Sequence, residues 1–223
     1  MEKLVVCSIA SWPPRIKYVP ACIRSLLNQT IKPDLIMLNC SKLEFPNGIA
    51  DFPQELQELI GSEKTIRVTF EAQNIGAFRK EIVPAASLYG QNYFLLTFDD
   101  DYVYHEKYIE SMLKKIGYHD DYSPVAGGIC GGTHIIRGEV LLPAFWKKLT
   151  KDIVDTRIND TWTTIYLVHV GANCFWENCP EIMAMRIPNG NAESVSTNCE
   201  MTGGYPQALQ RRAIELSFEA LRN

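Results

Sequence analysis

Short apolar runs alternate with stretches of helical periodicity through the first half of the chain. The apolar runs are predicted strands: Leu4–Ala10, Asp34–Leu38, Thr65–Phe70 and Tyr93–Phe98. The stretches between them place apolar residues three or four positions apart and are predicted helices: Tyr18–Asn28, Pro53–Ile60 and Phe78–Tyr89. Alternation of this kind is typical of βαβ units. We therefore expect an α/β fold with a mostly parallel central sheet flanked by helices.

The second half of the chain shows this alternation less clearly. Helices are predicted at His105–Ile116, Thr161–Val170 and Ala208–Leu221, and a strand at Thr133–Arg137. A glycine-rich segment, residues 127–132, precedes that strand and is expected to turn tightly or to be flexible. Asp160 stands directly before the second of these helices and is predicted to be its N-cap. No repeat or linker divides the chain, so residues 1–223 are expected to form one domain.

Charge and composition exclude some classes of protein. The formal net charge is −4 and the isoelectric point is about 5.6, whereas nucleic-acid-binding domains gather Lys and Arg on one face. Nucleic acid is therefore not an expected partner. Hydrophobic residues make up 46% of the chain, far above the level of disordered proteins, which predicts a folded core.

The cysteines and the N-terminal residues favour a cytoplasmic location. The seven cysteines are scattered and lack the paired short spacing of a zinc site, so we expect them to be reduced and structural. The chain runs into Leu4–Ala10 without a basic leader, and this stretch is too short to span a membrane.

Three consecutive aspartates, Asp99, Asp100 and Asp101, follow the apolar strand that ends at Phe98. Open α/β sheets bind ligands beyond the carboxyl ends of their strands, so this acidic triplet is expected in that crevice. Adjacent carboxylates repel one another unless something positive is bound, and their oxygens suit Mg²⁺ or Mn²⁺. On an extended backbone, Asp99 and Asp101 point to one side and Asp100 to the other. The alternative is a solvated acidic turn that caps the helix at His105.

Three segments of the chain resemble GT-A fold glycosyltransferases. They are Ser8–Ile16, Ser25–Asp34 and Thr97–Tyr104. The sequence is most similar to bacterial enzymes of surface-polysaccharide assembly in the inverting family 2, over roughly residues 3–175. The resemblance implies a Rossmann-like GT-A domain, in which residues 1–101 bind a nucleotide sugar and residues 102–223 bind the acceptor.

The resemblance implies a nucleotide-sugar donor, and UDP is the family's commonest nucleotide. Ala10, Ser11 and Arg15 match the nucleotide-contacting loop after the first strand. Lys80 or Arg79, which follow the turn after the third strand, would offer a positive charge to phosphate. The alternatives are a plain surface position for Arg15 and a solvated helix face for the other two cations.

The resemblance gives the acidic triplet a role in holding the donor. Asp99 and Asp101 would bind Mn²⁺ or Mg²⁺ on the diphosphate, with Asp99 reaching either the metal or the ribose and Asp100 giving local support. Such a cation stabilises the negative charge that develops on the leaving group. The implied acceptor is a hydroxyl of a glycan or of a lipid-linked sugar, and a lipid-linked acceptor would add peripheral contact with the inner face of the membrane.

Family members carry a catalytic acid late in the domain, usually in an acidic pair that starts a helix. Asn159-Asp160-Thr161-Trp162 looks like this motif, with Asn159 where a second acid is common. Asp160 is therefore the candidate general base. It would remove the proton of the acceptor hydroxyl while that oxygen attacks the anomeric carbon with inversion.

The histidines and tryptophans receive no catalytic role from the sequence. His105, His119, His134 and His169 lack the spacing of metal ligands, so a histidine would join the metal only from a distant position. Trp146, Trp162 and Trp176 have spacings that are typical of core packing rather than of sugar stacking.

Three other functions fit part of the pattern. A phosphohydrolase of the haloacid dehalogenase type also uses Asp-x-Asp after an apolar strand, but here no convincing acidic pair follows in the distal half. A nucleotidyltransferase shares the nucleotide and metal chemistry, but its Gly-rich, Arg-containing loop after the first strand is missing. The non-enzymatic alternative is a degenerate GT-A domain that acts as a binding subunit, which Asn159 favours.

Overall fold

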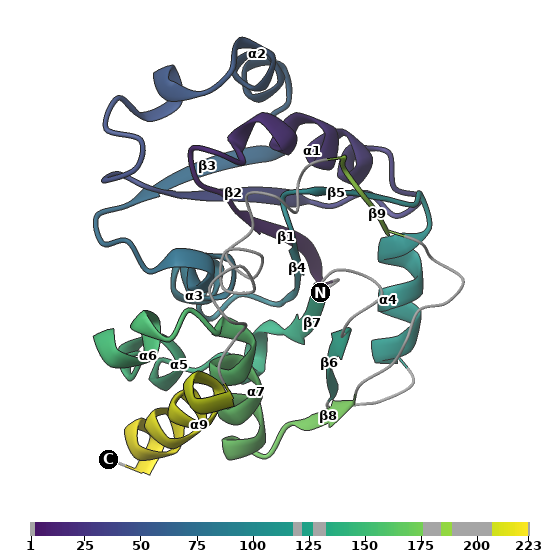
Figure 1. The fold of residues 1–223 in the computed structure, drawn as a ribbon. Helices are drawn as coiled ribbons and strands as arrows, with labels where there is room; N and C mark the ends of the chain where they lie inside the picture. The colour runs from purple at the N-terminus through teal and green to yellow at the C-terminus, as the bar shows by residue number, and fades with distance from the viewer. Residues whose placement is uncertain (1–2, 118–121, 127–132, 176–183, 189–206, 223) are drawn as a thin grey trace.

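The structure is a computed structural model of the 223-residue chain, and it describes residues 3–117, 122–126, 133–175, 184–188 and 207–222. In this part of the chain, the central sheet has seven strands in the order β3-β2-β1-β4-β7-β6-β8 (Figure 1). Its strands are β1 (Leu4–Ala10), β2 (Leu35–Ser41), β3 (Ile66–Glu71), β4 (Tyr93–Phe98), β6 (Tyr122–Ala126), β7 (Thr133–Arg137) and β8 (Asn173–Phe175).

Most neighbouring strands of the sheet are parallel, as predicted. β3, β2, β1 and β4 form parallel pairs, and β8 is parallel to β6. β7 is antiparallel to both of its neighbours, β4 and β6. A separate pair of short strands, β5 (Tyr102–Tyr104) and β9 (Ala184–Arg186), is antiparallel. The predicted α/β fold with a mostly parallel sheet is confirmed.

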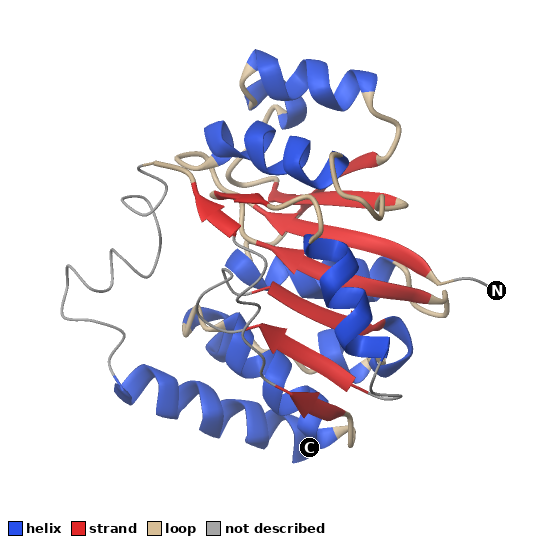
Figure 2. Cartoon of the chain, turned by 90° about the vertical axis from the view of Figure 1, so that its right-hand side faces the viewer, coloured by secondary structure: helices blue, strands red, loops and turns tan. Residues whose placement is uncertain are grey.

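Helices cover both faces of the sheet (Figures 1 and 2). They are α1 (Val19–Leu27), α2 (Gln54–Ser62), α3 (Arg79–Ser87), α4 (Tyr108–Gly117), α5 (Ala144–Lys147), α6 (Lys151–Asp155), α7 (Asn159–His169) and α9 (Gln207–Arg222). Because successive side chains of a strand point to opposite faces, β1 contributes to two cores. Val5, Cys7 and Ile9 pack with α1, α2 and α4, whereas Val6 packs with α3, α7 and α9.

The two central strands are buried on both faces, which explains why their sequences are continuously apolar. Val6, Leu95 and Leu96 are fully buried. The end of β7 lies so close to β4 that only glycine fits at residue 138. A Cβ atom on Gly138 would lie 2.3 Å from Cε1 of Tyr93.

The prediction that Asp160 is the N-cap of its helix is wrong. α7 begins at Asn159, its N-cap is Ile158, and no side chain makes a capping hydrogen bond. Asp160 lies inside the first turn, where a negative charge is favourable beside the helix N-terminus. Its carboxylate is therefore free to make tertiary contacts. The predictions for residues 127–132, His119 and Trp176 lie outside the described residues.

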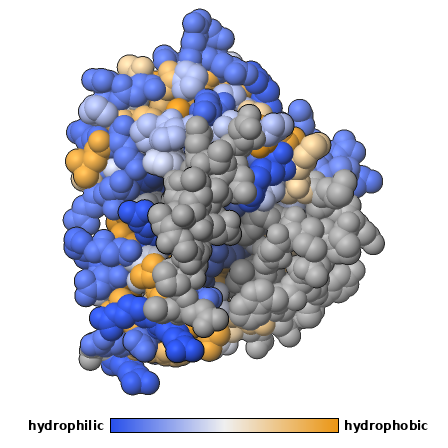
Figure 3. Space-filling view, in the orientation of Figure 1, coloured by the Kyte–Doolittle hydropathy of each residue, from blue (hydrophilic) through white to orange (hydrophobic). Residues whose placement is uncertain are grey.

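The cysteines that the structure describes are unpaired, in agreement with the prediction of reduced thiols. Cys7, Cys22 and Cys40 are buried and Cys174 is half-buried. The tryptophan prediction is also confirmed at Trp162, which is fully buried in the second core. In the space-filling view, the surface over α2 and over α9 is largely hydrophilic, and the hydrophobic patches on this face are small and separate (Figure 3).

Candidate active site

Ser11 and the acidic triplet lie side by side beyond the carboxyl ends of β1 and β4. The two strands are parallel neighbours, with Ile9 opposite Phe98, so the residues that follow each strand emerge at the same edge of the sheet. Ser11 Oγ donates a hydrogen bond of 2.6 Å to Asp100 Oδ2. The edge is therefore built by two loops that are about 90 residues apart in sequence.

Arg15 joins two of the three acids. Its Nη2 forms ion pairs with Asp100 Oδ1 and Asp101 Oδ1. The Arg15 side chain is only 13% exposed, so the alternative of a plain surface cation is wrong. The predicted alternation of the triplet is wrong too, because residues 100 and 101 lie in a turn rather than in an extended strand. Both of their carboxylates thus reach the same guanidinium.

Asp99 is paired with a different cation. Lys80, in the first turn of α3, donates a hydrogen bond of 3.1 Å from Nζ to Asp99 Oδ1. Burial by itself lowers the pKa of Lys80, but the negative charges of Asp99, Glu81 and Asp160 together raise that pKa above its ordinary value. The negative charges around Lys80 therefore favour its charged form.

Arg79 holds the loop rather than facing the triplet. Its Nη2 donates a hydrogen bond of 3.0 Å to the carbonyl oxygen of Ser11, and its Nη1 forms an ion pair of 2.8 Å with Glu44 Oε2. Arg79 and Lys80 are both buried, so the alternative of a solvated helix face is wrong for both. Of the two candidate phosphate cations, Lys80 is the one directed at the acidic residues.

A third cation reaches the triplet from late in the chain. Arg186 lies in β9, where it is the register partner of Tyr102. Its Nε lies 3.5 Å from Asp101 Oδ2, and its guanidinium covers the Tyr102 ring at 4.8 Å. Nothing in the sequence around Arg186 indicated this contact, because it depends on the pairing of β5 with β9.

The chain itself balances the charge of the acidic triplet. Arg15, Lys80 and Arg186 supply three positive charges, so the mutual repulsion of the aspartates does not by itself require a bound metal. Burial raises the pKa of Asp100 to about 7, although the Arg15 charge and the Ser11 hydroxyl act in the opposite direction. Carboxylate oxygens at this edge still have the chemistry that Mg²⁺ and Mn²⁺ prefer. Asp99 is the accessible member, with 33% of its side chain exposed.

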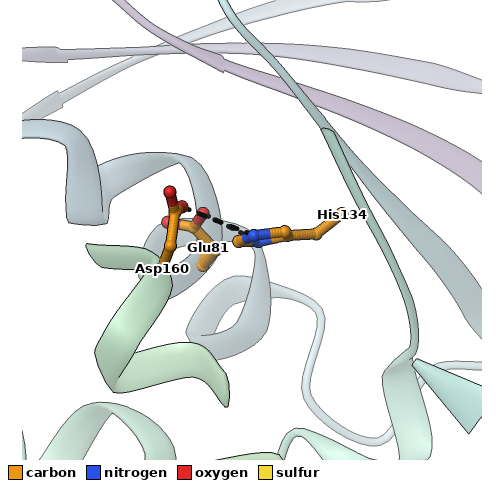
Figure 4. A group of neighbouring side chains, drawn as sticks. All are labelled: Glu81, His134 and Asp160. Carbon is orange, nitrogen blue, oxygen red and sulfur yellow. Dashed lines mark ion pairs between the residues drawn. The ribbon is translucent and has the colours of Figure 1, made fainter. Parts of the chain in front are cut away.

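Asp160 belongs to a second cluster that adjoins Lys80. The ring of His134, in β7, points at Glu81 of α3 and Asp160 of α7, which lie next to each other (Figure 4). His134 Nδ1 is 3.3 Å from Glu81 Oε1, and His134 Nε2 is 3.4 Å from Asp160 Oδ1. Asn159 Nδ2 donates hydrogen bonds of 2.9 Å to Glu81 Oε1 and 3.0 Å to Asp160 Oδ1.

Two members of this second cluster were missed by the sequence analysis. Glu81 directly follows Lys80, and an acid beside a candidate phosphate cation was a usable signal. His134 gave no signal of its own, because its neighbours come from α3 and α7. Glu81, His134 and Asp160 each offer one metal-ligand type of atom, and these atoms lie within 4.8 Å of one another.

The arrangement of the sheet and the position of these residues define the fold. The mostly parallel sheet, with polar and acidic residues beyond the ends of β1 and β4, is GT-A-like. The predicted GT-A-like fold is confirmed. No family model and no curated protein matches the sequence.

Solved structures with this fold include two kinds of protein. S. aureus TarS, residues 1–349, matches 98% of this chain and 71% of its own length, with 12% identity and a TM-score of 0.55. The complex of the same protein with UDP-GlcNAc gives a TM-score of 0.54 at 12% identity, over 96% of this chain and 71% of TarS. A 4-diphosphocytidyl-2C-methyl-D-erythritol synthase matches at 6% identity and a TM-score of 0.53, over 86% of this chain and 97% of its own.

Among the described residues, none of the helices is both long enough and apolar enough to span a membrane.

Proposed function

We propose that this chain is a glycosyltransferase that transfers a sugar from a nucleotide sugar, with UDP as the nucleotide, to a hydroxyl of a glycan or of a lipid-linked acceptor. The observation that carries the proposal is the position of Lys80, which is paired with Asp99 and lies within the electrostatic reach of Asp160. Lys80 would thus connect the acidic triplet, where the diphosphate would bind, with the candidate base Asp160. The resemblance of the sequence and the GT-A-like fold, which TarS shares in its complex with UDP-GlcNAc, both support this proposal.

In this proposal, residues 1–101 hold the donor. Ala10 and Ser11, at the end of β1, would contact the nucleotide, and the bond from Arg79 to the Ser11 carbonyl keeps that loop in place. Lys80 and Arg15 would place positive charge beside the diphosphate. Asp100 accepts a hydrogen bond from Ser11 and forms an ion pair with Arg15, so it links the loop after β4 to the loop after β1.

A divalent cation, Mn²⁺ or Mg²⁺, fits the same edge by the chemistry of its donors. Asp99 and Asp101 would hold it, and it would supply Lewis-acid stabilisation to the leaving diphosphate. Asp101 is engaged by Arg15 and Arg186 in the structure, so these ion pairs compete with a metal for the same carboxylate.

Residues 102–223 would bind the acceptor, and Asp160 would be the general base. The Asp160 side chain is 53% exposed, so an acceptor hydroxyl arriving from solvent can reach it. Asp160 takes the hydroxyl proton, the oxygen forms a bond to the anomeric carbon, and the bond from that carbon to the diphosphate breaks with inversion. The leaving diphosphate keeps the electron pair and is stabilised by the Lys80 charge.

A thermal-shift screen of nucleotide sugars with and without Mn²⁺ tests donor and metal together, because a ligand bound only by the folded state raises the melting temperature. We expect a UDP-sugar to stabilise the wild type more with Mn²⁺ than without it. Asp101→Asn should lose the Mn²⁺-dependent part of the shift. An unchanged Mn²⁺-dependent shift in that variant would reject the metal role of Asp101.

Substitution at the candidate base tests the reaction itself. Asp160→Asn should keep the donor-induced thermal shift and lower the turnover number about 10²- to 10⁴-fold, the usual contribution of a general base. The matched control is Asp152→Asn, an exposed acid of α6, which should retain wild-type turnover. Near-normal turnover by Asp160→Asn would place the base elsewhere.

A nucleotidyltransferase is the second candidate, because the synthase with this fold is matched over 97% of its length. The released product separates the two activities. A glycosyltransferase releases a nucleoside diphosphate from a nucleotide sugar, whereas a nucleotidyltransferase releases pyrophosphate from a nucleoside triphosphate. Donor binding without either product would instead identify a catalytically degenerate binding subunit. A cytoplasmic location remains a prediction from the sequence.

A further inference from the structure

Three contacting side chains connect the protein interior to the candidate base. Glu81 and His134 are 1% and 0% exposed, whereas the Asp160 side chain is 53% exposed. A substrate can therefore touch Asp160 but not the two residues behind it. Glu81 and Asp160 lie on the same side of the His134 ring, and Asn159 Nδ2 bridges them, because it donates to Glu81 Oε1 and to Asp160 Oδ1. The asparagine that departs from the family's acidic pair thus bridges two other acids.

Three buried atoms of this cluster lack hydrogen bonds. Within the described part of the chain, His134 Nδ1, His134 Nε2 and Glu81 Oε2 are buried atoms without a hydrogen-bond partner. A buried polar atom that lacks a partner destabilises the folded state, so three such atoms in one place require an explanation. His134 Nδ1 faces a carboxylate oxygen that can accept its proton. His134 Nε2 faces an oxygen of Asp160, which is itself an acceptor until it gains a proton.

We propose that His134 and Glu81 serve as a buried proton relay behind Asp160, in which Glu81 fixes the proton of His134 on Nδ1 and the free Nε2 receives the proton that Asp160 removes from the acceptor. This inference rests on the proposed function, since Asp160 must be the base. The proton passes from the acceptor oxygen to Asp160, and then from Asp160 to His134 Nε2. The resulting imidazolium keeps its Nδ1–H directed at the Glu81 carboxylate, and the proton later returns to solvent through the exposed Asp160.

The relay places a second proton acceptor behind the candidate base. A neutral imidazole carries a proton on one ring nitrogen and can accept another proton on the other nitrogen. The charged groups that face His134 are Glu81 from α3 and Asp160 from α7. Lys80 adjoins both of these acids, and β4 contributes only the uncharged Thr97, whose Oγ1 accepts from the His134 backbone N–H.

The same three residues also have the composition of a metal site, in which one ring nitrogen of His134 would bind the ion and the other would donate to a carboxylate. The relay uses both nitrogens, each of which lies 3.3–3.4 Å from a different carboxylate. The catalytic hydrogen bonds of free enzymes are often long and shorten when substrate binds.

Kinetics of His134→Gln test the relay, with UDP-GlcNAc as the probe and release of UDP as the signal. The turnover number should fall at least tenfold while the KM for the donor stays within twofold. The acid limb of the pH profile should move to lower pH, because glutamine cannot take up a proton. His169→Gln, an exposed histidine at the end of the same helix as Asp160, is the control and should behave as the wild type.

The outcomes separate the relay from the proposed function. If the wild type releases UDP and His134→Gln keeps its turnover and pH profile, the relay is wrong and the glycosyltransferase remains. A loss that is equal at every pH and is accompanied by weaker donor binding would show that His134 is merely structural. If the wild type releases no UDP, both proposals fail.

Nitrogen NMR of the histidine ring tests the relay without turnover. In the free wild type, we expect neutral His134 to carry its proton on Nδ1, and Glu81→Gln to weaken that preference. A proton on Nε2 would overturn the relay, because that nitrogen would then be unable to accept another. Displacement of the His134 signals by Mn²⁺ or Zn²⁺, lost in Asp160→Asn, would overturn it in favour of a metal site.

Discussion

Arg15 forms buried ion pairs that stabilise the site. Its guanidinium pairs with Asp100 and Asp101, whose side chains are 4% and 2% exposed. Removal of one partner of a buried ion pair leaves an uncompensated charge in the interior. Arg15 therefore stabilises the fold in addition to any contact with a ligand.

The first prediction concerns this pair. Arg15→Met should lower the free energy of unfolding by about 3–5 kcal/mol, the usual cost of a broken buried ion pair. Arg24→Met is the matched control, because the Arg24–Glu55 pair is about half exposed on both sides and pairs of this kind contribute about 0–1 kcal/mol. Urea unfolding of both variants checks this, and equal losses would contradict the role given to Arg15.

The second prediction concerns the pH dependence of stability. Burial raises the pKa of Asp100 to about 7 from 3.8, so between these values the folded state holds more protons than the unfolded state. This group therefore makes the protein less stable as the pH rises through that window. Asp100→Asn removes this titration. As the pH rises from 5 to 8, its free energy of unfolding should increase by about 3 kcal/mol relative to that of the wild type, since each pKa unit corresponds to about 1.4 kcal/mol. Urea unfolding in EDTA at several pH values measures this difference. Free energies of unfolding that change in parallel with pH in the two proteins would contradict the prediction.

Local motifs predicted some residues of the site, whereas residues whose contacts depend on long-range pairing were not predicted. Ser11, Arg15, Lys80 and the triplet were predicted from local motifs, and the structure brings them together. Glu81, His134 and Arg186 were not predicted. Their contacts join β7 to α3 and β9 to β5, and no local pattern encodes such pairings. The roles of all these residues in catalysis remain proposals.

At the scale of elements, the sequence predicted strands better than helix ends. β1 and β4 were found at their observed bounds, because strands buried on both faces are read directly as apolar runs. α7 was found as a helix, but its start was wrong by two residues, since Asp160 has the residue type of a cap without serving as one. The antiparallel placement of β7 and the β5–β9 pair was not predicted, because short strands carry no signal of their partners.

The third prediction tests the close approach of β4 and the end of β7. Gly138→Ala would place a Cβ atom 2.3 Å from the buried Tyr93 ring, and such overpacking costs about 1–3 kcal/mol. Gly61→Ala, in α2, meets nothing within 4 Å and should be neutral or stabilising by up to about 1 kcal/mol, because alanine favours a helix. Thermal or urea unfolding of both variants gives the comparison. A similar change in both would show that Tyr93 yields at no cost.

At the scale of the whole molecule, the two cores cover both faces of the sheet and bury the described thiols of the first core. Burial raises the pKa of Cys7 and of Cys22 well above the usual thiol value, and that of Cys40 to about 12. The reactive species of a cysteine is the thiolate. Access to these sulfurs therefore requires opening of the domain rather than a local movement.

The fourth prediction follows from this burial. Iodoacetamide at pH 8 should leave Cys7, Cys22 and Cys40 unmodified in the native protein and modify all three in urea. Peptide mass spectrometry assigns the label to each cysteine. Labelling of any of the three at the rate of the unfolded chain would show that the first core opens without global unfolding.

The counter-charges of the acidic triplet separate folding from metal supply. Arg15, Lys80 and Arg186 are already paired with the aspartates, so folding of this site does not depend on a metal ion for charge balance. Under the proposed function, a cell short of the metal would hold folded but inactive protein, which would act once the ion returned.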